Sequence, residues 1–188
     1  SELRLSGQPI PTLQSIDMSG KVIYMNTFTK TLCSTVRISY MILPQPLLEP
    51  FYERLSFYSC TVSNFEQYTL ARFIEEGKFE SHVNRLRSHY RKKRDIFLEA
   101  LHHSKLEHLA TVSGSEAGFH FLLTLRTDIP QETVIARAQS KSIKLVPLSS
   151  YYYGEAPEHV QNVYVMNFSS LDVSRAEEIC RRLYACCV

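Results

Sequence analysis

The sequence predicts an α/β fold in which helices and short strands share one core and the later strands pair antiparallel. Short β runs and amphipathic helical segments follow one another along the 188 residues. The longest helical segment, residues 79–103, carries apolar side chains at spacings near three, four and seven. A hydrophobic content of 44% is ordinary for a globular protein, so the chain can bury a sizeable core.

The first 46 residues predict a loop followed by two strands. Residues 1–12 contain no helix-capping signal and are expected to form an irregular loop. Residues 21–25 are a short β run. Residues 36–43 alternate well enough for a second strand, which Pro44 and Pro46 end.

Two helices are expected next. Residues 47–59 are expected to be helical. Residues 63–76 predict a better-defined helix, because Ser63 is a suitable N-cap and Glu66 stands three residues later, as in a capping box. Gly77 is expected to end that helix.

The remaining segments, after the long helix of residues 79–103, mix strands with helices. Strands are expected at residues 109–112, 118–125, 143–146 and 163–168, and helices at residues 130–140 and 174–186.

The bulk properties exclude several classes of protein. A net charge of +2 gives no reason to expect that this segment binds nucleic acid by itself. No apolar run approaches the ~18 residues of a membrane span, and no signal peptide is recognisable, so a cytoplasmic protein without a membrane partner is expected. The five cysteines form no CxxC pair, and His102, His103 and His108 show no ligand spacing, so no metal site is predicted.

A lysine flanked by hydroxyl residues follows the first predicted strand, in the segment Thr27-Phe28-Thr29-Lys30-Thr31-Leu32. A lysine amine forms a Schiff base with an aldehyde once it has lost its proton. The hydroxyls of Thr27 and Thr29 and the guanidinium of Arg37 are suited to hold a phosphate. Spacing alone favours the ordinary interpretation, a solvated loop lysine and a surface arginine. Cys33 could be imagined as a nucleophile, but no acid or base partner is recognisable nearby.

Three stretches of the sequence carry a family resemblance, at residues 6–11, 22–32 and 37–44. They resemble the fold-type I aminotransferase superfamily, and within it the effector domain of MocR-type regulators of the GntR family. The resemblance continues through residues 64–67, 70–77, 79–82, 91–95 and 117–120.

The resemblance implies pyridoxal 5'-phosphate as the cofactor. In the family, the position matching Lys30 forms the aldimine with the cofactor, and the positions matching Thr27 and Arg37 hold its phosphate. Thr29 is expected to assist from the same loop.

It also implies a domain organisation. Residues 1–50 would be the last part of the cofactor-binding large domain, residues 51–74 connecting helices, and residues 75–188 a small C-terminal α/β domain.

The chain departs from the family pattern in two respects. An Asp-Tyr pair, the ring-stacking residue and a glycine-led phosphate loop stand upstream of the matching region in the family and are absent from these 188 residues. The chain is therefore expected to be a C-terminal fragment. Many aminotransferases also place an arginine for the substrate carboxylate where this chain has Val165.

Three functions stay open from the sequence. The first is part of a regulator that senses a small amine, an amino acid or pyridoxal phosphate itself, forms a homodimer, and binds DNA only through an N-terminal domain absent here. The second is part of a genuine aminotransferase acting on amino acids. The third is a folded scaffold without activity, since half of the cofactor site is missing. The basic run between Arg85 and Arg94 is expected to be a solvated helix face.

Overall fold

The computed structural model describes residues 3–188, which fall into two compact units. The first unit comprises residues 8–86 together with Leu3, and the second unit comprises residues 4–7 and 87–188. Residues 1 and 2, where the predicted 1–50 domain begins, lie outside the described residues. The predicted division at residues 50 and 75 stays a prediction.

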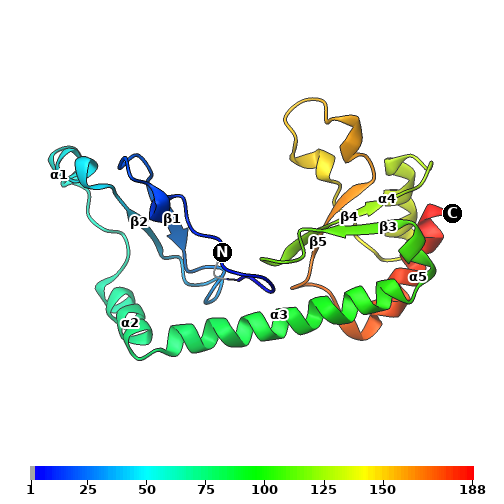
Figure 1. Cartoon of the computed structure of the whole chain (residues 1–188), viewed down its shortest axis with the longest axis horizontal. Coiled ribbons are helices and arrows are strands. Elements are labelled where there is room, and N and C mark those ends of the chain that lie inside the picture. Colours follow the sequence, from blue (N-terminus) through cyan, green and yellow to red (C-terminus); the bar gives the residue numbers. More distant parts are fainter. Residues whose placement is uncertain (1–2) are drawn as a thin grey trace. The chain divides into compact units, whose positions relative to one another are not determined.

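The first unit contains a two-stranded antiparallel sheet and two helices (Figure 1). β1 (Tyr24–Thr27) pairs with β2 (Ser39–Ile42), with Met25 opposite Met41. A 3₁₀ turn (Gln45–Leu47) leads into α1 (Leu48–Leu55), and α2 (Asn64–Glu75) follows. β2 is shorter than the strand predicted at residues 36–43, and β1 begins three residues later than the strand predicted at residues 21–25, because only the residues of β1 and β2 make ladder pairs.

The N-terminus of α2 carries the predicted capping box. The Ser63 hydroxyl accepts the Glu66 N–H at 3.2 Å and donates to the Glu66 carboxylate at 2.9 Å. In this form of the box the Ser63 hydroxyl satisfies one backbone N–H that the first helical turn leaves without a partner, and the Glu66 carboxylate binds the hydroxyl of Ser63 instead of its N–H. After α2 the chain passes through Gly77, whose φ of +69° is the left-handed conformation that glycine adopts without strain.

Replacing Ser63 with alanine should lower the free energy of unfolding by about 1 kcal/mol, since the Glu66 N–H loses its acceptor. Urea unfolding followed by far-ultraviolet circular dichroism measures the change. Ser81→Ala, on an exposed position of the next helix, is the matched control and should have little effect. Equal destabilisation by both substitutions would contradict a role for the cap.

Asp17 organises the turn that leads into β1. One carboxylate oxygen accepts the N–H and O–H of Ser19, each at 2.9 Å. The other accepts the N–H groups of Lys21 at 2.7 Å and Val22 at 2.8 Å. The hydrogen bonds from Val22 and Ser19 lower the pKa of Asp17 from its ordinary 3.8 to about 2.

This carboxylate should make the turn sensitive to acid. Because the folded pKa is depressed, its contribution to stability is complete above the ordinary value of 3.8 and is lost as pH falls through about 2. An NMR titration of the Asp17 carboxyl carbon should give a midpoint near 2, and Asp17→Ala should abolish the acid-dependent change in Val22 amide exchange. A midpoint at the ordinary value would show that the four hydrogen bonds do not persist in solution.

The second unit is built around a three-stranded antiparallel sheet of order β3-β4-β5. Its elements after α3 (Lys78–His102), whose first nine residues belong to the first unit, are β3 (Ala110–Ser113), β4 (His120–Leu125), α4 (Gln131–Ser140), β5 (Val163–Asn167) and α5 (Ala176–Cys187). The antiparallel pairing of the later strands is as predicted.

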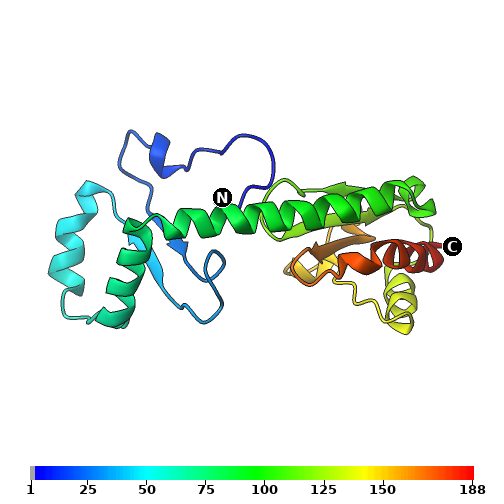
Figure 2. The same ribbon diagram turned by 90° about the horizontal axis from the view of Figure 1, so that it is seen from below.

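The core of the second unit lies on one face of this sheet. Alternate residues of β4, beginning with Phe121, are buried, and α3 and α5 cover them (Figures 1 and 2). The ring of Phe121 stacks on Phe168 at 4.3 Å between centroids and contacts Phe97 of α3 at 5.4 Å. Leu183 and Cys186 close the core from α5.

The prediction of a strand at residues 143–146 is wrong. That segment runs beside β5 but exchanges few hydrogen bonds with it: Val165 N–H donates to the Val146 carbonyl at 2.8 Å, and Pro147 bridges to Tyr164. Pro147 has no N–H to donate, so the ladder cannot continue. The apolar residues that suggested a strand pack against the core instead: Leu145 is buried in it, and Ile143 contacts it.

Candidate functional site

The residues predicted to bind a cofactor lie at the end of β1 and in the loop of residues 28–38, which joins β1 to β2. Backbone hydrogen bonds close both ends of this loop. Phe28 N–H donates to the Ile38 carbonyl at 3.0 Å, and the Phe28 carbonyl accepts the N–H groups of Thr31 and Leu32 at 3.1 and 2.8 Å. The turn that contains Lys30 is therefore fixed at its base.

Thr27, Thr29 and Arg37 form one hydrogen-bonded cluster in the structure. The hydroxyl oxygens of Thr27 and Thr29 lie 3.0 Å apart. Thr27 donates to the Ile38 carbonyl at 3.1 Å, and Thr29 donates to the Val36 carbonyl at 3.0 Å. Arg37 Nη1 donates to the Thr29 hydroxyl at 3.4 Å.

Lys30 follows Thr29 directly, and its side chain is exposed, as is that of Arg37. Of the five N–H donors of the Arg37 guanidinium, one is used by Thr29. The loop thus carries a guanidinium and two hydroxyls in one hydrogen-bonded cluster, and a primary amine on the residue that follows Thr29. Such a set of groups is chemically suited to an aldehyde that carries a phosphate.

Two positioning features of the loop were not predicted from the sequence. The Asn26 amide oxygen accepts the Thr27 N–H at 2.8 Å. The ring of Phe28 packs against Tyr40 at 5.3 Å and against Phe79 at 5.6 Å between centroids, so the loop base is anchored to β2 and to the first turn of α3. Asparagine at the end of a strand is a recognisable signal for such a bond, whereas the aromatic contacts join residues far apart in sequence.

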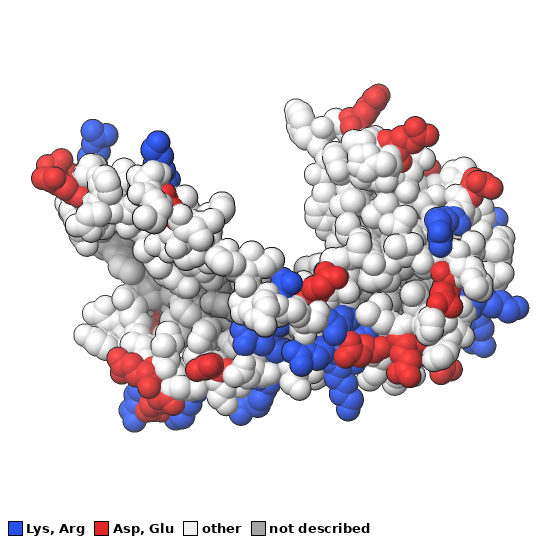
Figure 3. All heavy atoms as spheres, in the orientation of Figure 1, with Lys and Arg blue, Asp and Glu red and all other residues white. Residues whose placement is uncertain are grey.

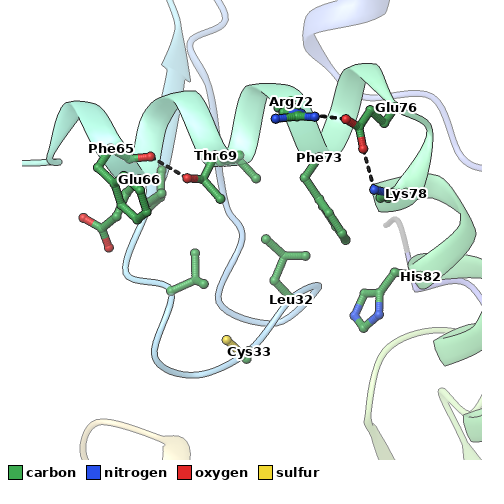
Figure 4. A pocket seen from close by; sticks show the side chains of 13 residues that line it. Leu32, Cys33, Phe65, Glu66, Thr69, Arg72, Phe73, Glu76, Lys78 and His82 are labelled. Atoms are coloured by element: carbon green, nitrogen blue, oxygen red, sulfur yellow. Dashed lines mark hydrogen bonds and ion pairs between the residues drawn. The ribbon is translucent and has the colours of Figure 1, made fainter.

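An apolar groove lies behind this loop, between residues 32–38 and α2 (Figure 4). We call it the α2 groove; its volume is about 530 Å³. It is lined by Leu32, Cys33, Val36, Ile38, Phe65, Glu66, Thr69, Leu70, Arg72, Phe73, Glu76, Lys78 and His82. At its rim Glu76 pairs with Arg72 at 2.7 Å and with Lys78 at 2.5 Å.

Cys33 lines the α2 groove and is exposed. Its Sγ lies 3.0 Å from the Thr35 hydroxyl. This contact, together with a hydrogen bond from the Val36 N–H, lowers the pKa of the Cys33 thiol.

Two arginines of the basic run on α3 bind other residues of the second unit. Arg91 Nε donates to the Leu5 carbonyl at 2.7 Å, and Arg94 donates to the Ser6 hydroxyl at 3.1 Å and pairs with Asp95. Figure 3 shows the Lys and Arg side chains of this region lying among Asp and Glu side chains. Arg91 and Arg94 thus differ from the solvated helix face that was expected for the run, since each binds groups of the second unit.

Nowhere in the described part of the chain do three or more His, Cys, Asp or Glu side chains gather so that they could hold a metal ion. None of the helices described is both long enough and apolar enough to cross a membrane.

Comparison with known proteins shows relatives of two kinds, although no family model matches the chain. The sequence is 40% identical over 172 residues to the uncharacterized HTH-type transcriptional regulator YdeL of Bacillus subtilis, covering 92% of this chain and 37% of that protein. It is 31% identical over 178 residues to the probable rhizopine catabolism regulatory protein MocR of Rhizobium meliloti, covering 95% of this chain and 35% of that protein. The structure matches Pyrococcus horikoshii kynurenine aminotransferase with a TM-score of 0.79 and 29% identity, covering 98% of this chain and 45% of that one.

The fold is that of the pyridoxal-phosphate-dependent aminotransferases of fold type I, as the resemblance implied. In sequence, the chain is related to the MocR-type transcriptional regulators, which confirms the finer resemblance. The chain spans little more than a third of the length of these curated relatives.

Proposed function

We propose that the chain is part of the aminotransferase-like effector domain of a MocR-type transcriptional regulator, and that this domain binds pyridoxal 5'-phosphate. The observation that carries the proposal is the Thr27–Thr29–Arg37 cluster next to Lys30. Lys30 would bind the aldehyde carbon of the cofactor through its amine. Arg37, with Thr27 and Thr29, would hold the phosphate. When bound, the cofactor supplies an electrophilic carbon that the nitrogen of a small amine or an amino acid would attack.

The regulator is favoured over the enzyme by the residue at position 165. Val165 lies in β5 opposite Leu122, where many aminotransferases carry an arginine for the substrate carboxylate. A valine cannot pair with a carboxylate, so the ordinary recognition of amino-acid substrates is missing at this position. Relatives named as transcriptional regulators support the same choice.

The remaining parts of the proposal concern the whole protein. We propose a cytoplasmic homodimer whose DNA-binding part lies outside these 188 residues. Its ligand would be a small amine, an amino acid or the cofactor itself.

The alternative is a genuine aminotransferase, favoured by the structural match to kynurenine aminotransferase. The two functions differ in what happens after an amino donor is added to the full gene product loaded with pyridoxal phosphate. A regulator should change its affinity for promoter DNA without turning over a keto acid. Steady transfer of the amino group to a keto acid, with no effect on DNA binding, would establish the enzyme and overturn the proposal.

Arg37 is expected to contribute to binding of the phosphate group and not to the reaction of the aldehyde. Arg37→Gln should weaken capture of pyridoxal phosphate about 10- to 100-fold, because hydrogen bonds between charged groups contribute about 1.5–3 kcal/mol. Capture of pyridoxal, which lacks the phosphate, should be unchanged. Absorbance titration of both aldehydes measures the two constants. An equal loss for the two aldehydes would place Arg37 away from the phosphate.

A further inference from the structure

A second hollow lies in the second unit, where the end of α4 packs on α5 (Figures 1 and 2). We call it the α4–α5 pocket; its volume is about 480 Å³. It is lined by Ser140, Lys141, Ser142, Arg181, Arg182 and Ala185. Three of these six side chains are cationic, two carry hydroxyls, and none is acidic. The composition of the lining thus favours an anion.

Arg182 builds the pocket. Its Nη1 donates to the Lys141 carbonyl at 2.7 Å, and its Nη2 binds the carboxylate of Glu178, one turn earlier on α5. Glu178 also pairs with Arg175 at 2.8 Å. Arg182 therefore ties the end of α4 to α5, and its own charge is balanced by Glu178.

The other two cations of the lining carry charges that nothing balances. Among the described residues, neither Lys141 nor Arg181 forms an ion pair. Lys141 is partly buried, and Glu177, one turn before Arg181 on α5, is exposed and unpaired as well. Like charges that line one pocket repel each other, and an anion bound between them replaces this repulsion with attraction.

The end of α4 does not oppose an anion strongly. The last carbonyl oxygens of a helix carry partial negative charge, which disfavours a bound anion. Here the Ala138 carbonyl accepts the N–H groups of Lys141 at 3.0 Å and Ile143 at 2.9 Å. The Gln139 carbonyl accepts the Ser142 N–H at 3.0 Å, because Ser142 adopts a φ of +60° and turns the chain back. These hydrogen bonds reduce the negative charge that the helix end presents.

We propose that the α4–α5 pocket binds a phosphate group, held by the Lys141 ammonium and the Arg181 guanidinium with the help of the Ser142 hydroxyl. A planar guanidinium binds two phosphate oxygens at once, and an ammonium binds another as a point charge. The volume lies within the range of about 300–1,000 Å³ that is typical of small-molecule sites, so either free phosphate or a small phosphate ester fits. The site lies in the second unit and does not depend on Lys30 binding a cofactor.

The test is an NMR titration of the nitrogen-15-labelled chain with inorganic phosphate at constant ionic strength. The amide signals of Ser142 and Ala185 should shift and reach saturation. Replacing Lys141 and Arg181 together with glutamine should weaken this binding at least about tenfold, because the phosphate loses both of its charged donors. Since neither side chain takes part in an ion pair, the double variant should keep the melting temperature of the unaltered chain.

The matched control is the double variant Lys92→Gln with Lys144→Gln. It removes the same amount of charge from exposed positions outside the pocket and should bind phosphate as the unaltered chain does. Three results would overturn the proposal. They are shifts that do not saturate by about 20 mM phosphate, equal weakening in the two double variants, and equally tight binding of acetate at the same signals.

A parallel titration with glycerol 3-phosphate distinguishes the two sources of the phosphate group. Tighter binding of the ester than of inorganic phosphate would assign the pocket to an organic phosphate, whose remaining atoms fill the rest of the volume. Tighter binding of inorganic phosphate would assign it to the free ion, and both orders uphold the phosphate site. The Thr29 amide, in the first unit, reports separately on the phosphate cluster proposed for the cofactor, so failure at one site is read independently of the other.

Discussion

Replacing Lys30 with alanine is expected to abolish the covalent capture of pyridoxal phosphate. Lys30 directly follows Thr29 in the sequence and its side chain is exposed, so its amine is the proposed partner of an aldehyde whose phosphate is held by the Thr27–Thr29–Arg37 cluster. Without that amine, the cluster would still offer donors to a phosphate, but no bond to the aldehyde carbon would form. Borohydride reduction followed by peptide mapping should find the label on Lys30 in the unaltered chain and no label on this loop in the variant.

The control for this experiment is Lys21→Ala, which removes an exposed lysine just ahead of β1. Its labelling at Lys30 should equal that of the unaltered chain. The opposite result would be a label spread over many lysines, with Lys30→Ala lowering the total label only by the amount found on Lys30. That result would show that the loop confers no selectivity.

Replacing Phe121 with alanine should cause the largest loss of stability, about 3–5 kcal/mol in the second unit. The ring is 2% exposed and lies between Phe168 and Phe97. Its removal leaves a cavity, because β4 and α3 are held by the rest of the core and cannot move together to fill it. The chain has no tryptophan, so urea unfolding is best followed by circular dichroism and by amide exchange of Leu123 and Tyr164.

Phe57→Ala is the control for the core substitution, since the Phe57 ring is 73% exposed and its ring contact is with Tyr58, the next residue. It should change the free energy of unfolding by less than about 1 kcal/mol. A small effect of Phe121→Ala on amide exchange in β4 and β5 would mean that the three aromatic rings do not form the stabilising centre of this unit.

Most elements could be predicted from the sequence because their signals are local. The capping box at Ser63 and the apolar spacing of α3 depend on residues three to seven positions apart. The strand wrongly predicted at residues 143–146 shows the limit, since pairing is decided by a partner strand and by the missing N–H of Pro147. Likewise, no local pattern predicts that Arg91 holds the Leu5 carbonyl, 86 residues away.

For the candidate site, the family resemblance selects residues but says nothing of the hydrogen bonds between them. The resemblance selected Lys30, Arg37 and Thr27, and the structure links Arg37 to Thr27 through Thr29. That the threonine hydroxyls are turned toward the carbonyls of Val36 and Ile38 depends on how the loop folds back on itself. The α2 groove was not predicted from the sequence either, since its walls come from segments more than 25 residues apart.

The two threonine hydroxyls have a consequence for how readily the loop exchanges a ligand. Each hydroxyl has a single proton to donate. Thr27 and Thr29 together make three contacts that each require a donated proton: with the Ile38 carbonyl, with the Val36 carbonyl and with each other. Two protons cannot serve three contacts, so one of the three is always left without a proton. A phosphate bound as proposed above would take one of these protons from a backbone carbonyl, at a net cost near that of one neutral hydrogen bond, about 1 kcal/mol. When the phosphate leaves, the proton would return to the carbonyl, so the loop has its own acceptor for each hydroxyl that a ligand would use.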